Sequence, residues 1–142
     1  MNRKKVFVSF DYERDRNYYY LMKAWDANSA FEFVFSDYTS KEIKSDSVSV
    51  VKAALARKIG TATHTLVLVG KDANRIHPDS RLIGYRNWQC FEIAKSYEFG
   101  NKLIAVKLGS SFTFPEELYG KGASIAYSFT QEAIISALEK AY

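Results

Sequence analysis

Apolar residues occur along the chain in short runs that have the length and pattern of β-strands. Continuous runs, typical of strands buried on both faces of a sheet, occupy residues 6–10, 66–70 and 103–107. Residues 31–35 alternate between apolar and polar and are typical of an edge strand. A weaker run at residues 125–127 predicts a fifth strand.

Apolar residues at helical spacing separate these runs and predict four helices. The segments are residues 18–25, 48–59, 88–99 and a last helix that begins near Ser128 or Thr130. For the second helix, Asp46 or Ser47 is the expected N-cap and Gly60 the expected C-cap. Gly100 is expected to stop the third. The polar residues 71–87 are predicted to form a long loop.

Strands that alternate with helices predict an α/β fold in which helices cover both faces of a parallel sheet. We expect one domain over residues 1–142, a flavodoxin-like three-layer sandwich with a five-stranded parallel sheet of order 2-1-3-4-5. In that order the connections after strands one and three leave toward opposite faces. A ligand is therefore expected between the C-terminal ends of these two strands.

Three segments converge on the predicted crevice: Phe10 and Asp11 after the first strand, a turn at Asp37 after the second, and the loop that leads to Trp88 and Glu92. Trp88 and Glu92 lie one helical turn apart on the same helix face. A carboxylate beside an aromatic ring can stabilise the positive charge that develops on a sugar carbon when a glycosidic bond breaks.

The predicted apolar stripe of this helix consists of Cys90, Ile93, Ala94 and Tyr97, and Glu92 points roughly away from it. A solvated surface carboxylate is therefore the alternative interpretation of Glu92. Trp88 is expected to be structural rather than chemical, and Asp37 to be either a turn former or a ligand contact.

Composition and charge exclude several classes of protein. A single cysteine, Cys90, excludes an internal disulfide and a cysteine-rich zinc site, and it suits a reducing compartment. His64 and His77 have no matching acids, so no metal site is predicted. The net charge of +4 is spread over scattered cations, which argues against nucleic-acid binding. The basic start is too short for a signal peptide and no membrane-spanning stretch is present, so a cytoplasmic protein is expected.

The motifs around these residues resemble those of Toll/interleukin-1 receptor (TIR) domains. The resemblance covers roughly residues 5–108 and rests on the opening strand Val-Phe-Val-Ser-Phe, on Trp88-x-x-x-Glu92-Ile93, and on the Gly-Asn-Lys that precedes the strand at residues 103–107. Among TIR-like groups, the chain is most similar to the stand-alone bacterial TIR proteins of Thoeris anti-phage systems. The resemblance implies that the fold is a TIR fold.

It also implies a function, namely the hydrolysis or cyclisation of NAD with release of nicotinamide. Glu92 matches the catalytic glutamate of the family, and Phe10 and Asp11 match the loop that borders the dinucleotide. The loop at residues 37–42, which begins at Asp37, matches the loop through which TIR domains often self-associate and gate the site. NAD is then a substrate rather than a cofactor, and an ADP-ribose-type product would activate a separate effector protein.

The segment at residues 71–87 is longer than the usual TIR loop and is rich in arginine. Because a guanidinium group binds phosphate oxygens in a bidentate manner, we hypothesise that one of the arginines of this segment, Arg75, Arg81 or Arg86, contacts the pyrophosphate of the dinucleotide, and we expect Arg81 or Arg86 to be that residue.

Two further functions stay open at this point. A nucleoside deoxyribosyltransferase uses a related fold, and Glu92 would then be a covalent nucleophile. A non-catalytic TIR module would only dock partners through the Asp37 loop. A phosphorylated receiver domain fits poorly, because strand three ends in Gly70-Lys71 instead of an acceptor aspartate. A flavodoxin would need a phosphate-binding loop that the residues after Asp11 do not resemble.

Overall fold

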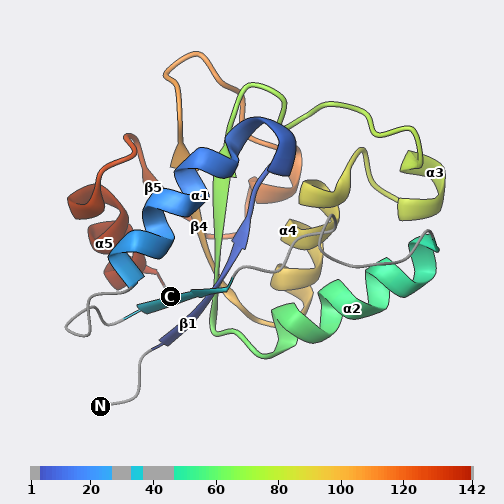
Figure 1. Cartoon of the computed structure of the whole chain (residues 1–142), viewed down its shortest axis with the longest axis horizontal. Coiled ribbons are helices and arrows are strands. Elements are labelled where there is room, and N and C mark those ends of the chain that lie inside the picture. Colours follow the sequence, from blue (N-terminus) through green and yellow to red (C-terminus); the bar gives the residue numbers. More distant parts are fainter. Residues whose placement is uncertain (1–3, 27–32, 37–46, 142) are drawn as a thin grey trace.

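A parallel five-stranded sheet forms the centre of the molecule (Figure 1). The computed structural model describes residues 4–26, 33–36 and 47–141. The order of the strands is β2-β1-β3-β4-β5, and every neighbouring pair is parallel. The strands are β1 (Lys4–Ser9), β2 (Phe33–Ser36), β3 (His64–Val69), β4 (Lys102–Lys107) and β5 (Ser124–Ala126). The predicted α/β class with a parallel sheet is confirmed.

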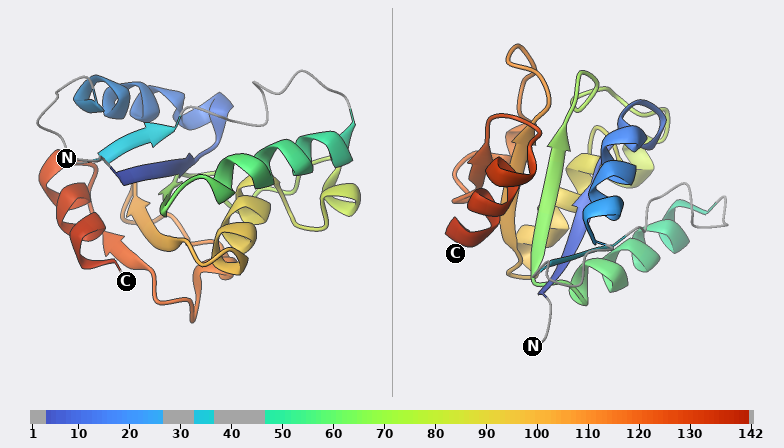
Figure 2. Two further views of the ribbon diagram at one scale, coloured as in Figure 1. Left: turned by 90° about the horizontal axis from the view of Figure 1, so that it is seen from below. Right: turned by 60° about the vertical axis from the view of Figure 1, so that its left-hand side comes forward.

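Helices cover both faces of the sheet, which gives three layers (Figure 2). The helices are α1 (Tyr12–Asp26), α2 (Val48–Gly60), α3 (Ser80–Ile83), α4 (Trp88–Glu98) and α5 (Gln131–Lys140), with a 3₁₀ turn η1 (Glu116–Leu118). Helices α1 and α5 pack on one face, and α2 and α4 pack on the other.

The pleat of the strands explains why both layers are apolar. Leu66 and Leu68 of β3 belong to the core under α1 and α5, whereas Val67 and Val69 belong to the core under α4. Side chains alternate across a strand, so a continuous apolar run supplies both cores at once. All residues of β3 are buried, including His64 and Thr65.

Several predicted boundaries need correction. Gly60 is the last residue of α2 rather than its C-cap, which is Thr61 in a right-handed conformation. Gly100 follows α4 with a φ of 82°, the left-handed conformation expected of a helix stop. Residues 71–87 are not only loop, because they contain α3. Of the two expected N-cap residues of α2, Ser47 is the one that precedes the helix, and of the two expected starts of α5, Thr130 is its N-cap.

Among the described residues, no helix combines the length and apolar character needed to cross a membrane. The predicted self-association loop at residues 37–42, including Asp37, lies outside the described residues.

Candidate functional site

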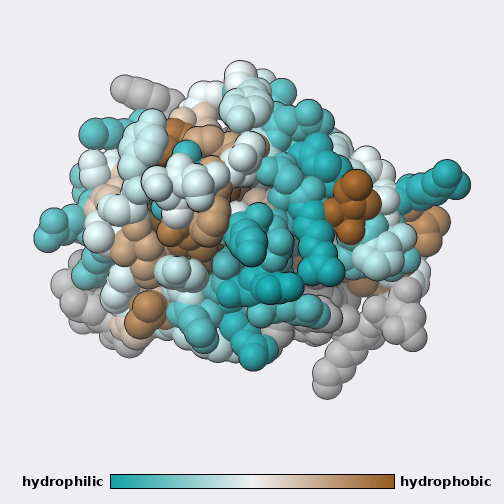
Figure 3. Space-filling model, turned by 90° about the horizontal axis from the view of Figure 1, so that it is seen from above, coloured by the Kyte–Doolittle hydropathy of each residue, from teal (hydrophilic) through white to brown (hydrophobic). Residues whose placement is uncertain are grey.

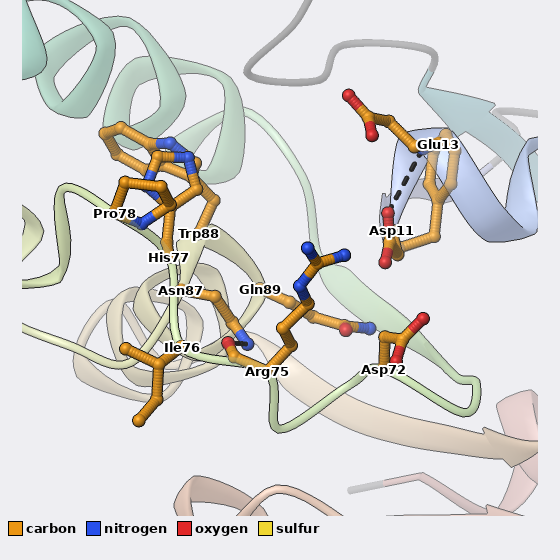
Figure 4. A pocket seen from close by; sticks show the side chains of 11 residues that line it. Asp11, Glu13, Asp72, Arg75, Ile76, His77, Pro78, Asn87, Trp88 and Gln89 are labelled. Atoms are coloured by element: carbon orange, nitrogen blue, oxygen red, sulfur yellow. Dashed lines mark hydrogen bonds between the residues drawn. The ribbon is translucent and has the colours of Figure 1, made fainter.

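A pocket of about 340 Å³ opens at the C-terminal ends of β1 and β3, where the following connections leave toward opposite faces of the sheet (Figure 4). Figure 3 looks onto this end of the molecule and shows hydrophilic side chains over much of it, flanked by apolar areas. We call this cavity the crevice pocket. It is lined by Phe10, Asp11, Glu13, Asp72, Arg75, Ile76, His77, Pro78, Asn87, Trp88 and Gln89.

Three of the predicted site residues line the crevice pocket. Phe10 follows β1 and stacks on Tyr19 of α1, with ring centroids 4.9 Å apart. Asp11 accepts a hydrogen bond from the backbone N–H of Glu13 and so begins α1 at the pocket wall. Trp88 opens α4, is half-buried and packs edge-on against Phe91. The crevice prediction therefore places these three side chains together.

Glu92 lies behind the pocket wall rather than on it. The side chain is only 5% exposed, and its Oε1 accepts a hydrogen bond of 2.6 Å from the hydroxyl of Ser9. Burial raises the pKa of Glu92 to about 8, and the Ser9 hydrogen bond partly offsets this effect. Because Ser9 ends β1, the carboxyl group lies beneath the residues that line the crevice pocket.

The burial of Glu92 corrects the predicted helix face. Tyr97, assigned to the buried stripe, is 50% exposed, whereas the polar residues Gln89, Glu92 and Ser96 are buried. Helix α4 packs close to the sheet, where these groups find partners: Ser96 donates to the Glu92 carbonyl at 2.7 Å and accepts from the Thr65 hydroxyl. The alternative of a solvated surface glutamate is therefore wrong.

Gln89 is a site residue that the sequence analysis missed. Its Nε2 donates to two backbone carbonyls, Ser9 O at 3.1 Å and Leu68 O at 2.8 Å, and so joins the C-terminal ends of β1 and β3. The spacing of Gln89, Glu92 and Ser96, at i, i+3 and i+7, is a helical stripe of polar residues. A polar stripe at this spacing is typical of a solvent-exposed helix face, so the sequence pattern contains no signal that it is buried.

The two arginines predicted to bind the pyrophosphate do not line the crevice pocket. Arg86 bonds to two carboxylates that follow β4, with Nη1 2.9 Å from Glu116 Oε1 and Nη2 2.8 Å from Glu117 Oε1. Arg81 is exposed on α3. Both predictions are therefore corrected, because Arg86 is neutralised away from the pocket and Arg81 is carried past it by α3.

Arg75 lines the crevice pocket in their place, and Figure 4 shows its guanidinium group extending among the lining side chains. Within the described part of the chain it has no ion-pair partner. Its segment is held from below, since the Asn87 amide donates to the carbonyls of Ala73 and Arg75 at 2.9 and 2.8 Å. The same Asn87 side chain caps α4 by accepting from the Cys90 N–H.

Carboxylates line the pocket wall that faces Arg75. Asp11, Glu13 and Asp72 line it, and Asp15 is buried beside Gly70. Burial, followed by the charges of Asp11 and Asp72, raises the pKa of Asp15 to about 6. A side chain at Gly70 would overlap the Asp15 carboxyl, so glycine at this position allows the close packing of α1 on β3. Arg14 pairs with Asp72 at 3.4 Å, and the Asp11 carboxylate on the same wall favours a cationic group.

The remaining titratable candidates lack the features of a nucleophile or metal ligand. Cys90 is fully buried, and burial raises the pKa of its thiol to about 12. His64 is buried at the start of β3, where burial lowers its pKa to about 4. Across residues 4–26, 33–36 and 47–141, no three His, Cys, Asp or Glu side chains are grouped to hold a metal ion.

Comparison with known proteins assigns the family. The family model described as Thoeris protein ThsB, TIR-like domain, matches residues 7–112, well over half of the chain. The matched region begins at Phe7 within β1 and contains β2, β3 and β4, together with Glu92 and every residue that lines the crevice pocket. A search of curated proteins found no match. The chain belongs to the Thoeris ThsB TIR-like domain family.

Proposed function

We propose that this protein is an NAD-consuming enzyme that cleaves the bond between nicotinamide and ribose, with Glu92 as its catalytic residue. One observation carries the proposal: a buried carboxyl group with a raised pKa lies directly behind a pocket at the switch point of the sheet. An ionisable group that is buried without a charged partner costs stability, and such groups concentrate at functional sites.

In the proposed reaction the C1′–N bond of the nicotinamide ribose breaks, and both electrons of the bond pass to the pyridinium nitrogen. Neutral nicotinamide leaves, and positive charge develops on the ribose. The ionised Glu92 carboxylate stabilises that charge. Water or a hydroxyl group of the same molecule then attacks C1′ and loses its proton, which gives ADP-ribose or a cyclic isomer.

In the conformation described here Glu92 is covered. Catalysis therefore requires the carboxyl group to leave Ser9 and turn toward the crevice pocket once NAD is bound. Such a step fits an enzyme that stays inactive until it is triggered. In a Thoeris system the product would act as a signal to a separate effector protein.

The rest of the crevice pocket suits the two charged parts of NAD. The carboxylate of Asp11, together with the ring of Trp88, favours the pyridinium cation, whereas the carboxylate of Asp72 is paired with Arg14 at 3.4 Å. The Arg75 guanidinium is the group available for the pyrophosphate. This assignment replaces the hypothesis that Arg81 or Arg86 binds it.

The raised pKa of Glu92 predicts how activity depends on pH. Only the ionised carboxylate stabilises a cation, so kcat/KM is expected to rise about tenfold per pH unit below a pKa of about 8 and to level off above it. Ser9→Ala removes the hydrogen bond that lowers this pKa, so the profile moves to higher pH and activity at pH 7 falls about tenfold. Nicotinamide release measured from pH 6 to 10 tests both expectations.

Ser96→Ala is the matched control, because Ser96 is equally buried but bonds to the backbone carbonyl of Glu92 rather than to its carboxyl group. Its pH profile should follow that of the wild type. If Ser9→Ala and Ser96→Ala give the same profile, the Ser9 hydroxyl does not set the ionisation of Glu92.

Replacing Arg75 with alanine is expected to raise KM for NAD about tenfold and to change kcat little, because a charge-assisted bond to phosphate stabilises substrate and transition state alike. Arg81→Ala removes an arginine of the same segment that is also exposed but does not line the pocket, and its KM should match that of the wild type. Equal KM values for the two variants would exclude Arg75 as the pyrophosphate ligand.

A further inference from the structure

The side-chain amide of Gln89 has a fixed orientation in the crevice pocket. Each of its two Nε2 hydrogens is used, one by Ser9 O and the other by Leu68 O. The reversed orientation would bring the amide oxygen against two carbonyl oxygens, so the amide cannot flip. The oxygen Oε1 is therefore held in one direction by the ends of two central strands.

This oxygen is a hydrogen-bond acceptor that no described residue uses. Gln89 lines the crevice pocket, yet no donor contacts its Oε1 among residues 4–26, 33–36 and 47–141. Oε1 is not fully enclosed by protein, so it retains access to the pocket space. A rigid, mostly buried acceptor of this kind suits a donor on a ligand.

We propose that Gln89 Oε1 accepts a hydrogen bond from the carboxamide N–H of nicotinamide and thereby selects NAD among pyridine dinucleotides, an inference that rests on the proposed function. Gln89 precedes Glu92 by three residues, which is a rise of about 4.5 Å along α4. The carboxamide nitrogen lies about one ring width from the ribose carbon. A ribose at Glu92 therefore brings the carboxamide to the level of Gln89.

The surroundings of Gln89 support a neutral donor group rather than an anion. Gln89 Oε1 can only accept a hydrogen bond, so a carboxylate at the position of the carboxamide would face it without a donor, and Asp11 adds a negative charge on the same pocket wall. An analogue without an N–H would leave Oε1 unpaired in a mostly buried position. Sites built around a hydrogen bond reject such analogues strongly.

The test compares NAD with 3-acetylpyridine adenine dinucleotide, in which a methyl group replaces the NH₂ of the carboxamide. Release of the two pyridines is measured for the wild type and for Gln89→Met, which keeps the length of the side chain. The kcat/KM for NAD divided by the kcat/KM for the acetyl analogue is expected to be at least tenfold lower in Gln89→Met than in the wild type. The intrinsic reactivities of the two leaving groups are the same for both proteins, and any loss of folded protein lowers the activity on both substrates alike. Both effects therefore cancel in this comparison.

Two controls accompany the measurement. Thionicotinamide adenine dinucleotide keeps the NH₂ group and should follow NAD. Gln131→Met, at an exposed position at the start of α5, should leave the ratio unchanged. If Gln89→Met lowers the activity on both dinucleotides equally, Gln89 only links the strands and the inference is overturned.

Product inhibition of the wild type provides a second measurement if Gln89→Met does not fold. Nicotinamide is expected to inhibit at least tenfold more tightly than 3-acetylpyridine, and equal inhibition would overturn the inference. The failure of the proposed function is distinct, because the wild type would then release no pyridine from any of the dinucleotides under activating conditions.

Discussion

Glu92→Gln is expected to lower the rate of nicotinamide release from NAD at least about a hundredfold. Glutamine keeps the size of the side chain, and its amide oxygen can still accept the hydrogen bond from Ser9. The substitution removes only the negative charge that would stabilise the developing cation. Mass spectrometry of the products, with the protein alone and with extract of phage-infected cells, measures the rate and identifies the nucleotide formed.

Glu98→Gln is the matched control for this experiment. It makes the same substitution on the same helix, but Glu98 is exposed and pairs only with Lys95 among the described residues. Its rate should equal that of the wild type. An unchanged rate in Glu92→Gln would exclude Glu92 as the catalytic residue. A trapped glycosyl-enzyme formed from a nucleoside, without NAD turnover, would instead indicate a deoxyribosyltransferase, and neither reaction would indicate a docking module.

The second large effect concerns stability. The pKa of Glu92 is raised from 4.5 to about 8 in the folded protein, so the folded state holds a proton that the unfolded state has lost between these values. The protonated carboxyl group is favourable below pH 4.5, and this advantage disappears as the pH rises through about 8. Glu92→Gln has no such proton. The variant is therefore expected to gain stability over the wild type across this window, up to about 5 kcal/mol.

Urea unfolding of both proteins at pH 5 and pH 8 measures this difference. At pH 5 the two free energies of unfolding should be close, and at pH 8 the variant should be the more stable. Asp15 and His64, whose pKa values are also shifted, are present in both proteins and cancel in the difference. An unchanged difference between the two pH values would mean that Glu92 is ionised throughout, and Glu98→Gln should show no pH-dependent difference.

The strands could be predicted from the sequence because β1, β3 and β4 are buried on both faces and read as unbroken apolar runs. The burial of the polar side of α4 could not be predicted from the sequence. Periodicity assigns Gln89 and Glu92 to solvent, and their partners lie far away in the sequence, at Ser9 for both residues and also at Leu68 for Gln89. A local pattern contains no information about such a distant acceptor or donor.

The residues of the pocket wall could be predicted only in part. Phe10 and Trp88 could be placed from the strand order, since Phe10 begins the connection after β1 and Trp88 opens the main helix of the connection after β3. Which arginine faces the pocket depends on where the chain turns within residues 71–87. The sequence pattern did not reveal α3 or the distant carboxylates that hold Arg86.

The contacts of Arg86 have a consequence for how this protein can be shortened. Its two carboxylate partners, Glu116 and Glu117, lie beyond residue 112, where the match to the family model ends. A fragment trimmed to that match would keep Glu92 but leave the half-buried guanidinium with only the Asn74 and Cys90 side chains. The recognisable family segment is thus smaller than the unit that can stand by itself, because the start of the helix that bears Glu92 is held by ion pairs to the stretch that follows β4.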